Sequence, residues 1–301
     1  MTIESAFSSD RLCCALTGMT VFEFHNLLPG FTSALREAQR ARNPQRIRAF
    51  GGGRIGLLPT PAHKLFAVLV YLKVYPTYDV LSFFLRLDRT RCFRWIQFLL
   101  PVLAKTLGRN LVLPKRQIRS VEEFFREFPE AKDIFIDGTE RRVQKPVSQK
   151  RRKKLYSGKK KATTRKTIVV SDDKKRILIL TPTKSGRRHD KRLFDKAMGG
   201  TTIPPSVTAW TDTGFQGLSK DHLNTIMPLK ATKYHRLTEE ERESNRLISG
   251  IRVLSEHAIA GIKRFRSTTD VYRNRVPNLD DTFMLLSAGL WNYHLQFSTT
   301  Q

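Results

Sequence analysis

The chain has 301 residues, of which 54 are lysine or arginine and 27 are aspartate or glutamate, so its formal net charge at pH 7 is +27. Its hydrophobic content of 40% is enough for a sizeable core, whereas the longest apolar run, residues 65–72, is far shorter than the ~20 residues that span a bilayer. We therefore expect about two globular domains and no membrane-spanning helix. Three cysteines, with no Cys/His spacing of a zinc site, exclude a disulfide scaffold and a zinc finger.

The excess of positive charge predicts a polyanionic partner, because self-repulsion of this size is costly unless counter-charges neutralise it. Counterion release drives basic proteins onto the phosphate backbone of nucleic acid. Nucleic acid is therefore the partner that the charge favours, and a membrane surface or simple solubility are the alternatives. Charge alone does not distinguish DNA from RNA, or a binding protein from an enzyme.

Residues 1–108 are predicted to form a helical DNA-binding domain. Apolar periodicity predicts three helices in its second half, over residues 63–75, 79–87 and 91–100. Thr90 would cap the third helix and Pro101 would end or kink it. Two helices joined by a tight turn, the second beginning with Arg91 and Arg94, are typical of a helix-turn-helix whose arginines contact base edges or phosphates. A small helical bundle without DNA contacts is the alternative.

Residues 109–301 are predicted to form an α/β domain. The β-branched and apolar runs predict four strands, the first three of them antiparallel, over residues 133–143, 167–170, 176–181 and 207–210. Helical patterns follow at residues 189–198, 239–265 and 280–297. Between the first two strands, residues 145–166 include 11 lysines and arginines, among them Lys159, Lys160 and Lys161. This stretch is predicted to follow phosphates, and a solvated hairpin is the alternative.

Three acidic residues stand where metal chemistry would need them. Asp137 lies inside an apolar strand, Asp212 directly follows another, and Glu256 lies on the long helix. Carboxylates at adjacent strand ends can converge, and such hard oxygen ligands suit Mg²⁺ or Mn²⁺. Two ions about 3.5–4 Å apart could activate water and stabilise the leaving oxygen in phosphodiester cleavage. Each acid alone also has a structural interpretation, as a strand-edge residue, a turn residue or a surface ion pair.

The long helix places Arg252, Glu256 and Lys263 on one face. The opposite face is predicted to be apolar, through Ile251, Leu254, Ala258, Ile262 and Phe265. The charged face therefore meets either solvent or a shared cleft. An Arg252–Glu256 ion pair on the surface is the simpler interpretation.

Five motifs follow one another in the second part of the chain: residues 137–141 (DGTER), 156–161 (YSGKKK), 186–190 (GRRHD), 211–217 (TDTGFQG), and Arg252, Glu256, His257 and Lys263. Together the series resembles the DDE-superfamily transposases of bacterial insertion sequences, in their Harbinger-like endonuclease branch. Residues 71–77 (YLKVYPT) resemble the helix-turn-helix domain that those enzymes carry. One position departs from the related signature: Ser249 stands where a tyrosine would precede the arginine by three residues.

The resemblance implies a ribonuclease-H-like catalytic domain with a mixed sheet, preceded by the helical domain. It implies that Asp137, Asp212 and Glu256 are catalytic and hold two Mg²⁺ (or Mn²⁺) ions, and that Arg252 and Lys263 hold DNA phosphates. The implied reaction cleaves the ends of the element and joins them to target DNA. His189 and Asp190 match a family motif, and we expect a structural role for them.

The implied partners are the terminal inverted repeats of the element and the target DNA, bound by a homodimer or a larger assembly in the bacterial cytoplasm, at the nucleoid. Two alternatives remain open at this point. One is a transposase-derived DNA-binding protein without catalysis. The other is a structure-specific nuclease of the same fold that cuts without strand transfer.

Overall fold

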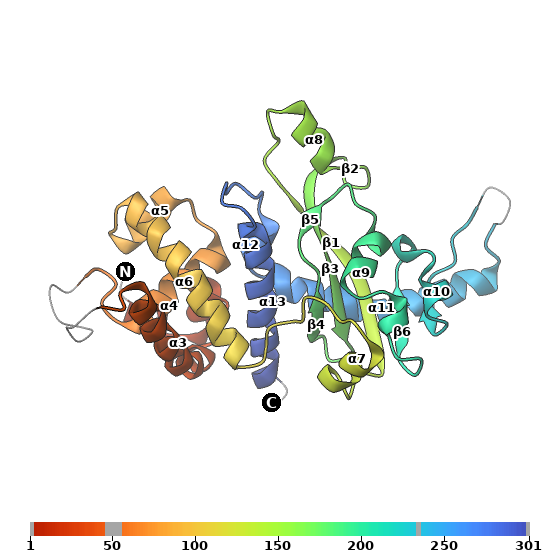
Figure 1. Ribbon diagram of the computed structural model, residues 1–301, viewed down its shortest axis with the longest axis horizontal. Coiled ribbons are helices and arrows are strands. Elements are labelled where there is room, and N and C mark those ends of the chain that lie inside the picture. Colours follow the sequence, from red (N-terminus) through yellow and green to blue (C-terminus); the bar gives the residue numbers. More distant parts are fainter. Residues whose placement is uncertain (1–2, 46–55, 233–235, 299–301) are drawn as a thin grey trace. The chain divides into compact units, whose positions relative to one another are not determined.

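The computed structural model describes residues 3–45, 56–232 and 236–298 (Figure 1). The chain divides into two compact units. We call the first the helical unit, which comprises Met1–Leu113, Lys263–Asp270 and Asn292–Gln301, and the second the sheet unit, which comprises Pro114–Ile262 and Val271–Trp291. Among the described residues no helix combines the length and apolar character that crossing a bilayer requires.

The helical unit contains the predicted helices and several that precede or follow them. Its helices are α1 (Ile3–Ala6), α2 (Asp10–Thr17), α3 (Val21–Arg42), α4 (Pro61–Val74), α5 (Tyr78–Leu85), α6 (Arg89–Arg109), α12 (Arg266–Thr269) and the end of α13 (Leu279–Ser298). The side chains of Thr60 and Thr77 each accept a hydrogen bond from a backbone N–H three residues on, so α4 and α5 begin where capping residues stand. Tyr75 and Arg86 end these two helices in the left-handed conformation.

The predicted cap of the third of these helices is wrong, and Pro101 does not end that helix. Helix α6 is capped by Asp88, whose Oδ1 accepts from Arg91 N at 2.9 Å, and not by Thr90. The helix also continues through Pro101 to Arg109. A proline inside a helix costs ~3 kcal/mol. Here the residues that flank it on both sides, Leu99, Leu100, Val102 and Leu103, are buried, and their packing outweighs that cost.

The sheet unit is built on one mixed sheet. Its strands are β1 (Asp133–Arg142), β2 (Tyr156–Ser157), β3 (Ala162–Asp172), β4 (Ile177–Leu180), β5 (Lys184–Ser185), β6 (Thr208–Thr211) and β7 (Thr225–Ile226). The order runs β2-β3-β1-β6-β7, with β4 and β5 also paired to β3. Strand β1 is antiparallel to β3 and parallel to β6. The α/β class and the mixed sheet of the ribonuclease-H-like expectation are therefore confirmed.

Helices cover both faces of this sheet, except α8 (Gln149–Leu155), which buries no residue and projects beyond the end of the sheet (Figure 1). The helices of the sheet unit are α7 (Val121–Glu127), α8, α9 (Asp190–Ala197), α10 (Leu218–Asp221), α11 (Glu239–Lys263) and the first part of α13, with 3-10 turns η1 (Gly200–Thr202) and η2 (Thr213–Phe215). On one face Ile136 and Ile168 pack with Phe194 of α9, and on the other Val169 packs with Ala258 of α11 and Met284 of α13. Because side chains alternate along a strand, odd-numbered residues of β1 lie on the α11 face.

Helix α11 differs from its prediction in two respects. It ends at Lys263, so Phe265 lies outside it. Its apolar face is also shorter than predicted, because Ile251 is 41% exposed whereas Ala258 and Ile262 are buried. The first half of the helix therefore extends without a covering core, and only the second half packs on the sheet.

Candidate active site

Two of the three predicted acids lie side by side. Strands β1 and β6 are parallel and Ile136 pairs with Thr211, so Asp137 and Asp212 follow at the same level of neighbouring strands. The Oδ1 atom of Asp137 accepts from Gly138 N at 2.6 Å. Asp212 caps η2, and its Oδ1 accepts from Gly214 N at 2.8 Å. Backbone N–H groups thus orient both carboxylates.

The electrostatics of the pair follow from its burial and its neighbours. Burial raises the pKa of Asp137, and the carboxylate of Asp212 raises it further. The Gly138 N–H and the cations Arg252 and Lys159 act in the opposite direction without cancelling the rise. The site therefore concentrates negative charge that a cation would relieve.

Cations from two other elements reach the acid pair. Lys159, in the basic stretch between β2 and β3, places Nζ 3.7 Å from Asp212 Oδ2. The positive charge of Arg252, on α11, lowers the pKa of Asp137. Lys160 and Lys161 follow Lys159 in the same loop and are exposed. A phosphate bound at the two carboxylates would therefore lie close to the Lys159 ammonium.

Glu256 is not brought together with the other two acids. It is exposed on α11, one turn beyond Arg252, and forms no ion pair with it among the described residues. In the ranges that the structure describes, no three His, Cys, Asp or Glu side chains are grouped as metal ligands. Lys263 is the last residue of α11 and belongs to the helical unit. The donor chemistry of Asp137 and Asp212, two hard carboxylates at one place, nevertheless fits a divalent cation such as Mg²⁺.

A buried ionic network lies on the other face of the sheet, and sequence reasoning did not find it. The Lys166 ammonium of β3 lies 3.1 Å from Glu140 Oε1 and 2.7 Å from Asp190 Oδ1. Glu140 Oε2 also accepts from Thr164 Oγ1 at 2.6 Å. Burial by itself would raise the pKa of Glu140, but its bonds to Thr164, Ser157 and Lys166 lower it overall. Two members of the network, Glu140 and Asp190, stand in the motifs at residues 137–141 and 186–190, but neither motif indicated that they meet at Lys166.

Asp190 connects this network to the acid pair. A β-carbon at Gly138 would lie 3.3 Å from Asp190 Oδ1, and one at Gly214 would lie 3.0 Å from Asp190 Oδ2 and 2.8 Å from Asp212 Oδ1. The glycine that follows Asp137 and the one that orients Asp212 therefore both pack against Asp190. His189, in contrast, is exposed and makes no capping hydrogen bond to α9, and His257 is exposed on α11.

In the helical unit, the two predicted DNA-contacting arginines are joined by a third. Arg91 and Arg94 are exposed near the start of α6 and line a small pocket of about 220 Å³ with Arg42, Trp95 and Phe98. The Arg42 guanidinium, from the end of α3, lies 5.6 Å from the Phe98 ring centroid. Arg91 Nε also lies 3.1 Å from Asp88 Oδ2, in a pair that is largely exposed. Arg42 was not predicted, because nothing local indicates that the end of α3 meets α6.

Comparison with known proteins decides the family. A family model described as DDE superfamily endonuclease matches residues 136–292, which include all three acids. The chain belongs to this family. The model described as helix-turn-helix of DDE superfamily endonuclease matches residues 58–109. The family and the helix-turn-helix that the motifs indicated are thereby confirmed.

One curated relative of this DDE endonuclease is named as a probable transposase. The chain is 34% identical over 110 residues to the "Probable transposase for insertion sequence element IS702" of Microchaete diplosiphon. That alignment covers 36% of this chain and 39% of the relative. No solved structure matches the chain.

Proposed function

We propose that the protein is a DNA transposase that cleaves the ends of its element and joins them to target DNA. One observation carries the proposal: in a DDE endonuclease chain, Asp137 and Asp212 lie side by side and are approached by Lys159 and Arg252. The relative's printed name, a probable transposase for an insertion sequence element, supports strand transfer in addition to cleavage.

Each residue of the site then has a role in in-line phosphoryl transfer. Two Mg²⁺ (or Mn²⁺) ions held by the carboxylates would supply Lewis-acid activation of the attacking hydroxyl and of the phosphorus centre. Asp137 and Asp212 are held in place by the Gly138 and Gly214 N–H groups. Lys159 and Arg252 orient the phosphodiester and stabilise the charge that develops on its oxygens.

Glu256 is proposed as the third carboxylate. It follows Arg252 by four residues on α11, so the two side chains share a face of the helix. The charge of Arg252 on that face lowers the pKa of Asp137. Its role stays a prediction, as does that of Lys263 as a phosphate contact. If three acids act as one unit, Glu256→Gln would abolish cleavage as completely as Asp137→Asn.

The DNA contacts extend over both units. We propose that Arg91 and Arg94, together with Arg42, bind the element end, and that Lys159, Lys160 and Lys161 hold the strand that is cut. The substrates would be the terminal inverted repeats and the target, and joining two ends requires at least a homodimer on DNA. Such an enzyme acts where the DNA is, which is the nucleoid of the bacterial cytoplasm.

A cleavage assay tests the proposal. Wild type, Asp137→Asn and Asp212→Asn are incubated with duplex DNA that carries the element's own end, in Mg²⁺, in Mn²⁺ and in EDTA. We expect the wild type to nick the element end only when metal is present. Both variants should still bind the DNA but should nick it no more than the wild type does in EDTA. The matched control is Asp173→Asn, which changes an exposed acid of the β3–β4 turn and should cut like the wild type.

A DNA-binding protein without catalysis is the second candidate, and the separation of Glu256 from the acid pair favours it. It predicts tight binding of the element end and no nicking by the wild type with either metal. That result would overturn the enzymatic proposal for this chain.

A further inference from the structure

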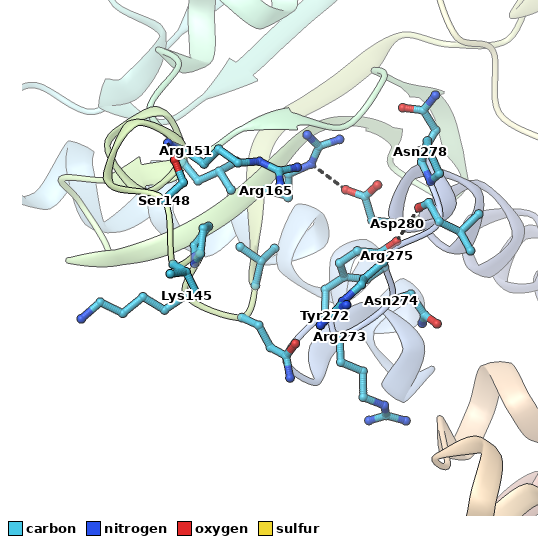
Figure 2. Close-up of a pocket in the computed structure, with 17 residues that line it drawn as sticks. Lys145, Ser148, Arg151, Arg165, Tyr272, Arg273, Asn274, Arg275, Asn278 and Asp280 are labelled. Carbon is cyan, nitrogen blue, oxygen red and sulfur yellow. Dashed lines mark hydrogen bonds and ion pairs between the residues drawn. The ribbon is translucent and has the colours of Figure 1, made fainter.

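A large groove in the sheet unit lies apart from the acid pair. It has a volume of about 950 Å³. One wall is the segment between β1 and the end of α8, residues 143–155, and the other is the segment that leads into α13, residues 272–280. Arg165 of β3 also lines the groove. Figure 2 shows Lys145, Arg151 and Arg165 on one side and Arg273 and Arg275 on the other; we call this the cationic groove.

The groove carries a strong excess of positive charge. Five of its lining residues are cationic and one, Asp280, is acidic. Asp280 is buried, and its Oδ2 accepts from Arg165 Nε at 2.6 Å, so its charge is paired with a cation of the protein itself. Lys145, Arg151 and Arg275 are exposed, and the described part of the chain places no carboxylate within ion-pair distance of them. Three of the cations that line the groove therefore have no carboxylate partner among the described residues.

Backbone hydrogen bonds join the two wall segments, so the groove exists before any ligand binds. Tyr272 N donates to Arg142 O at 2.9 Å, and Gln144 N donates to Tyr272 O at 3.1 Å. The Tyr272 ring also lies 5.0 Å from the Arg141 guanidinium, which is buried beneath it. Preformed sites lose less free energy to ordering when a ligand binds.

The groove lies on the same face of the sheet as Asp137. Arg165 pairs across from Arg141, four residues along β1 from Asp137, and side chains at this spacing share a face. At ~3.3 Å per residue, Arg165 is ~13 Å from the level of Asp137, and Val143, where the wall begins, is ~20 Å from it. A polymer that passes over the acid pair can therefore continue into the groove.

We infer that the cationic groove binds the phosphate backbone of DNA that flanks the cleaved phosphate. Successive phosphates of one strand lie ~3.4 Å apart along the duplex axis, so ~13–20 Å corresponds to about four to six nucleotides. Its donors are lysine, arginine and the amides of Asn274 and Asn278, which suit phosphate and sugar contacts that position DNA without reading its sequence. The distance from the cleavage point rests on the proposed function, whereas binding of DNA by the groove does not.

The first experiment compares two double variants of the full chain. Arg151→Ala/Arg275→Ala removes two charges from the groove. Arg126→Ala/Arg192→Ala removes two exposed charges from α7 and α9, which pack on the opposite face of the sheet. Affinity for a mixed-sequence duplex several helical turns long is measured over a range of KCl concentrations, and circular dichroism melting confirms that both variants fold.

The groove variant should lose about two phosphate contacts. We expect the slope of log K against log[KCl] to fall in magnitude by about 1.8, and the affinity at about 0.15 M KCl to drop on the order of 10- to 30-fold. The control variant should stay near wild type. Equal losses in the two variants would overturn the inference, and so would a loss seen with RNA of the same sequence but not with DNA.

The second experiment locates the contact. Duplexes with the element end are shortened stepwise on each side of the cleaved phosphate. On one side of the cleaved phosphate, the difference in DNA affinity between wild type and the groove variant should vanish once the flank is shorter than about four nucleotides. If the wild type never cuts but the groove variant alone loses DNA affinity, the transposase proposal is refuted and the inference that the groove binds DNA stands. If the wild type cuts and the groove variant binds DNA normally, only the inference that the groove binds DNA is refuted.

Discussion

At the scale of single residues, the acid pair is a place where function opposes stability. Asp137 and Asp212 repel each other, and burial raises the pKa of Asp137. A carboxyl whose folded pKa exceeds its unfolded value stabilises the fold only in its protonated form. That contribution is fully present below the unfolded pKa and is lost as the pH rises through the folded pKa. At neutral pH the ionised Asp137 therefore destabilises the metal-free protein.

The first prediction is that Asp137→Asn raises the melting temperature in EDTA at pH 7. The amide oxygen can still accept from Gly138 N, so the local geometry is kept while the repulsion is removed. The gain should shrink at about pH 4, where the wild-type carboxyl is increasingly protonated. Differential scanning calorimetry with Asp173→Asn as the control measures both effects. An unchanged or lower melting temperature at pH 7 would contradict the charge argument.

The second prediction concerns the glycine after Asp212. In Gly214→Ala the new methyl group would stand 2.8 Å from Asp212 Oδ1 and 3.0 Å from Asp190 Oδ2, so one carboxylate must move. A misplacement of about 1 Å can cost on the order of 100-fold in rate, and we expect a loss of that size in metal-dependent cleavage.

Gly250→Ala is the matched control, because nothing lies within 4 Å of its added carbon. It should cut normally and, since Gly250 lies inside α11, gain about 0.5–1 kcal/mol of stability. Normal cleavage by Gly214→Ala would show that the carboxylates tolerate displacement.

The residues themselves explain what could be predicted of the site. Asp137 inside an apolar run and Asp212 directly after another indicated convergence, which follows once the two runs pair as neighbouring strands, with Ile136 opposite Thr211. The Glu140, Lys166 and Asp190 network could not be predicted, since it depends on the register that sets Lys166 opposite Glu140. Period-two patterns predict a strand's faces and not its partner's register.

At the scale of elements, β3 carries the side chain on which this network depends. Lys166 is almost fully buried between Glu140 of β1 and Asp190 of α9. Removing one member of a buried ionic group leaves uncompensated charge, which costs about 3–5 kcal/mol. Two carboxylates would be stranded here.

The third prediction is that Lys166→Met lowers the free energy of unfolding at pH 7 by about 3–5 kcal/mol. The pKa of Glu140 is lowered in the fold, so its contribution is present above its ordinary value of 4.5 and is lost as the pH falls through the folded value. The difference between wild type and variant should therefore narrow at acid pH. Urea denaturation at several pH values measures it. Adding Glu140→Gln should restore part of the stability at pH 7, and no restoration would refute the ionic explanation.

The elements were predicted well where one local pattern dominates and poorly where tertiary packing decides. The strands β1 and β4 follow their apolar and β-branched runs closely, whereas β3 begins at Ala162, five residues before the run that predicted it. Helix α6 passes through Pro101 because its buried leucines contribute more than the proline costs, and no local rule contains that balance. The short strands β2, β5 and β7 are also beyond sequence reasoning, since pairing with a longer neighbour defines them.

At the scale of the whole molecule, the chain returns to the helical unit twice after the sheet unit has begun. Within the helical unit, Lys73 Nζ donates to Arg264 O at 2.9 Å, and His294 Nδ1 lies 2.5 Å from Glu23 Oε1. Contacts between residues so distant in sequence cannot be inferred from local patterns. The net charge, in contrast, could be read directly, and it governs the behaviour of the chain as a whole.

The fourth prediction is that salt has opposite effects on the free protein and on its complex with DNA. A net charge of +27 destabilises the compact state through self-repulsion. Raising KCl from about 0.1 M to about 1 M shortens the Debye length from about 10 Å to about 3 Å, so the melting temperature of the free protein should rise. Added duplex DNA should raise the melting temperature at low salt and lose this effect at high salt, because counterion release then gains less. Thermal melts with and without DNA at both salt concentrations test this. A free protein that melts lower in high salt would show that specific ion pairs outweigh the net repulsion.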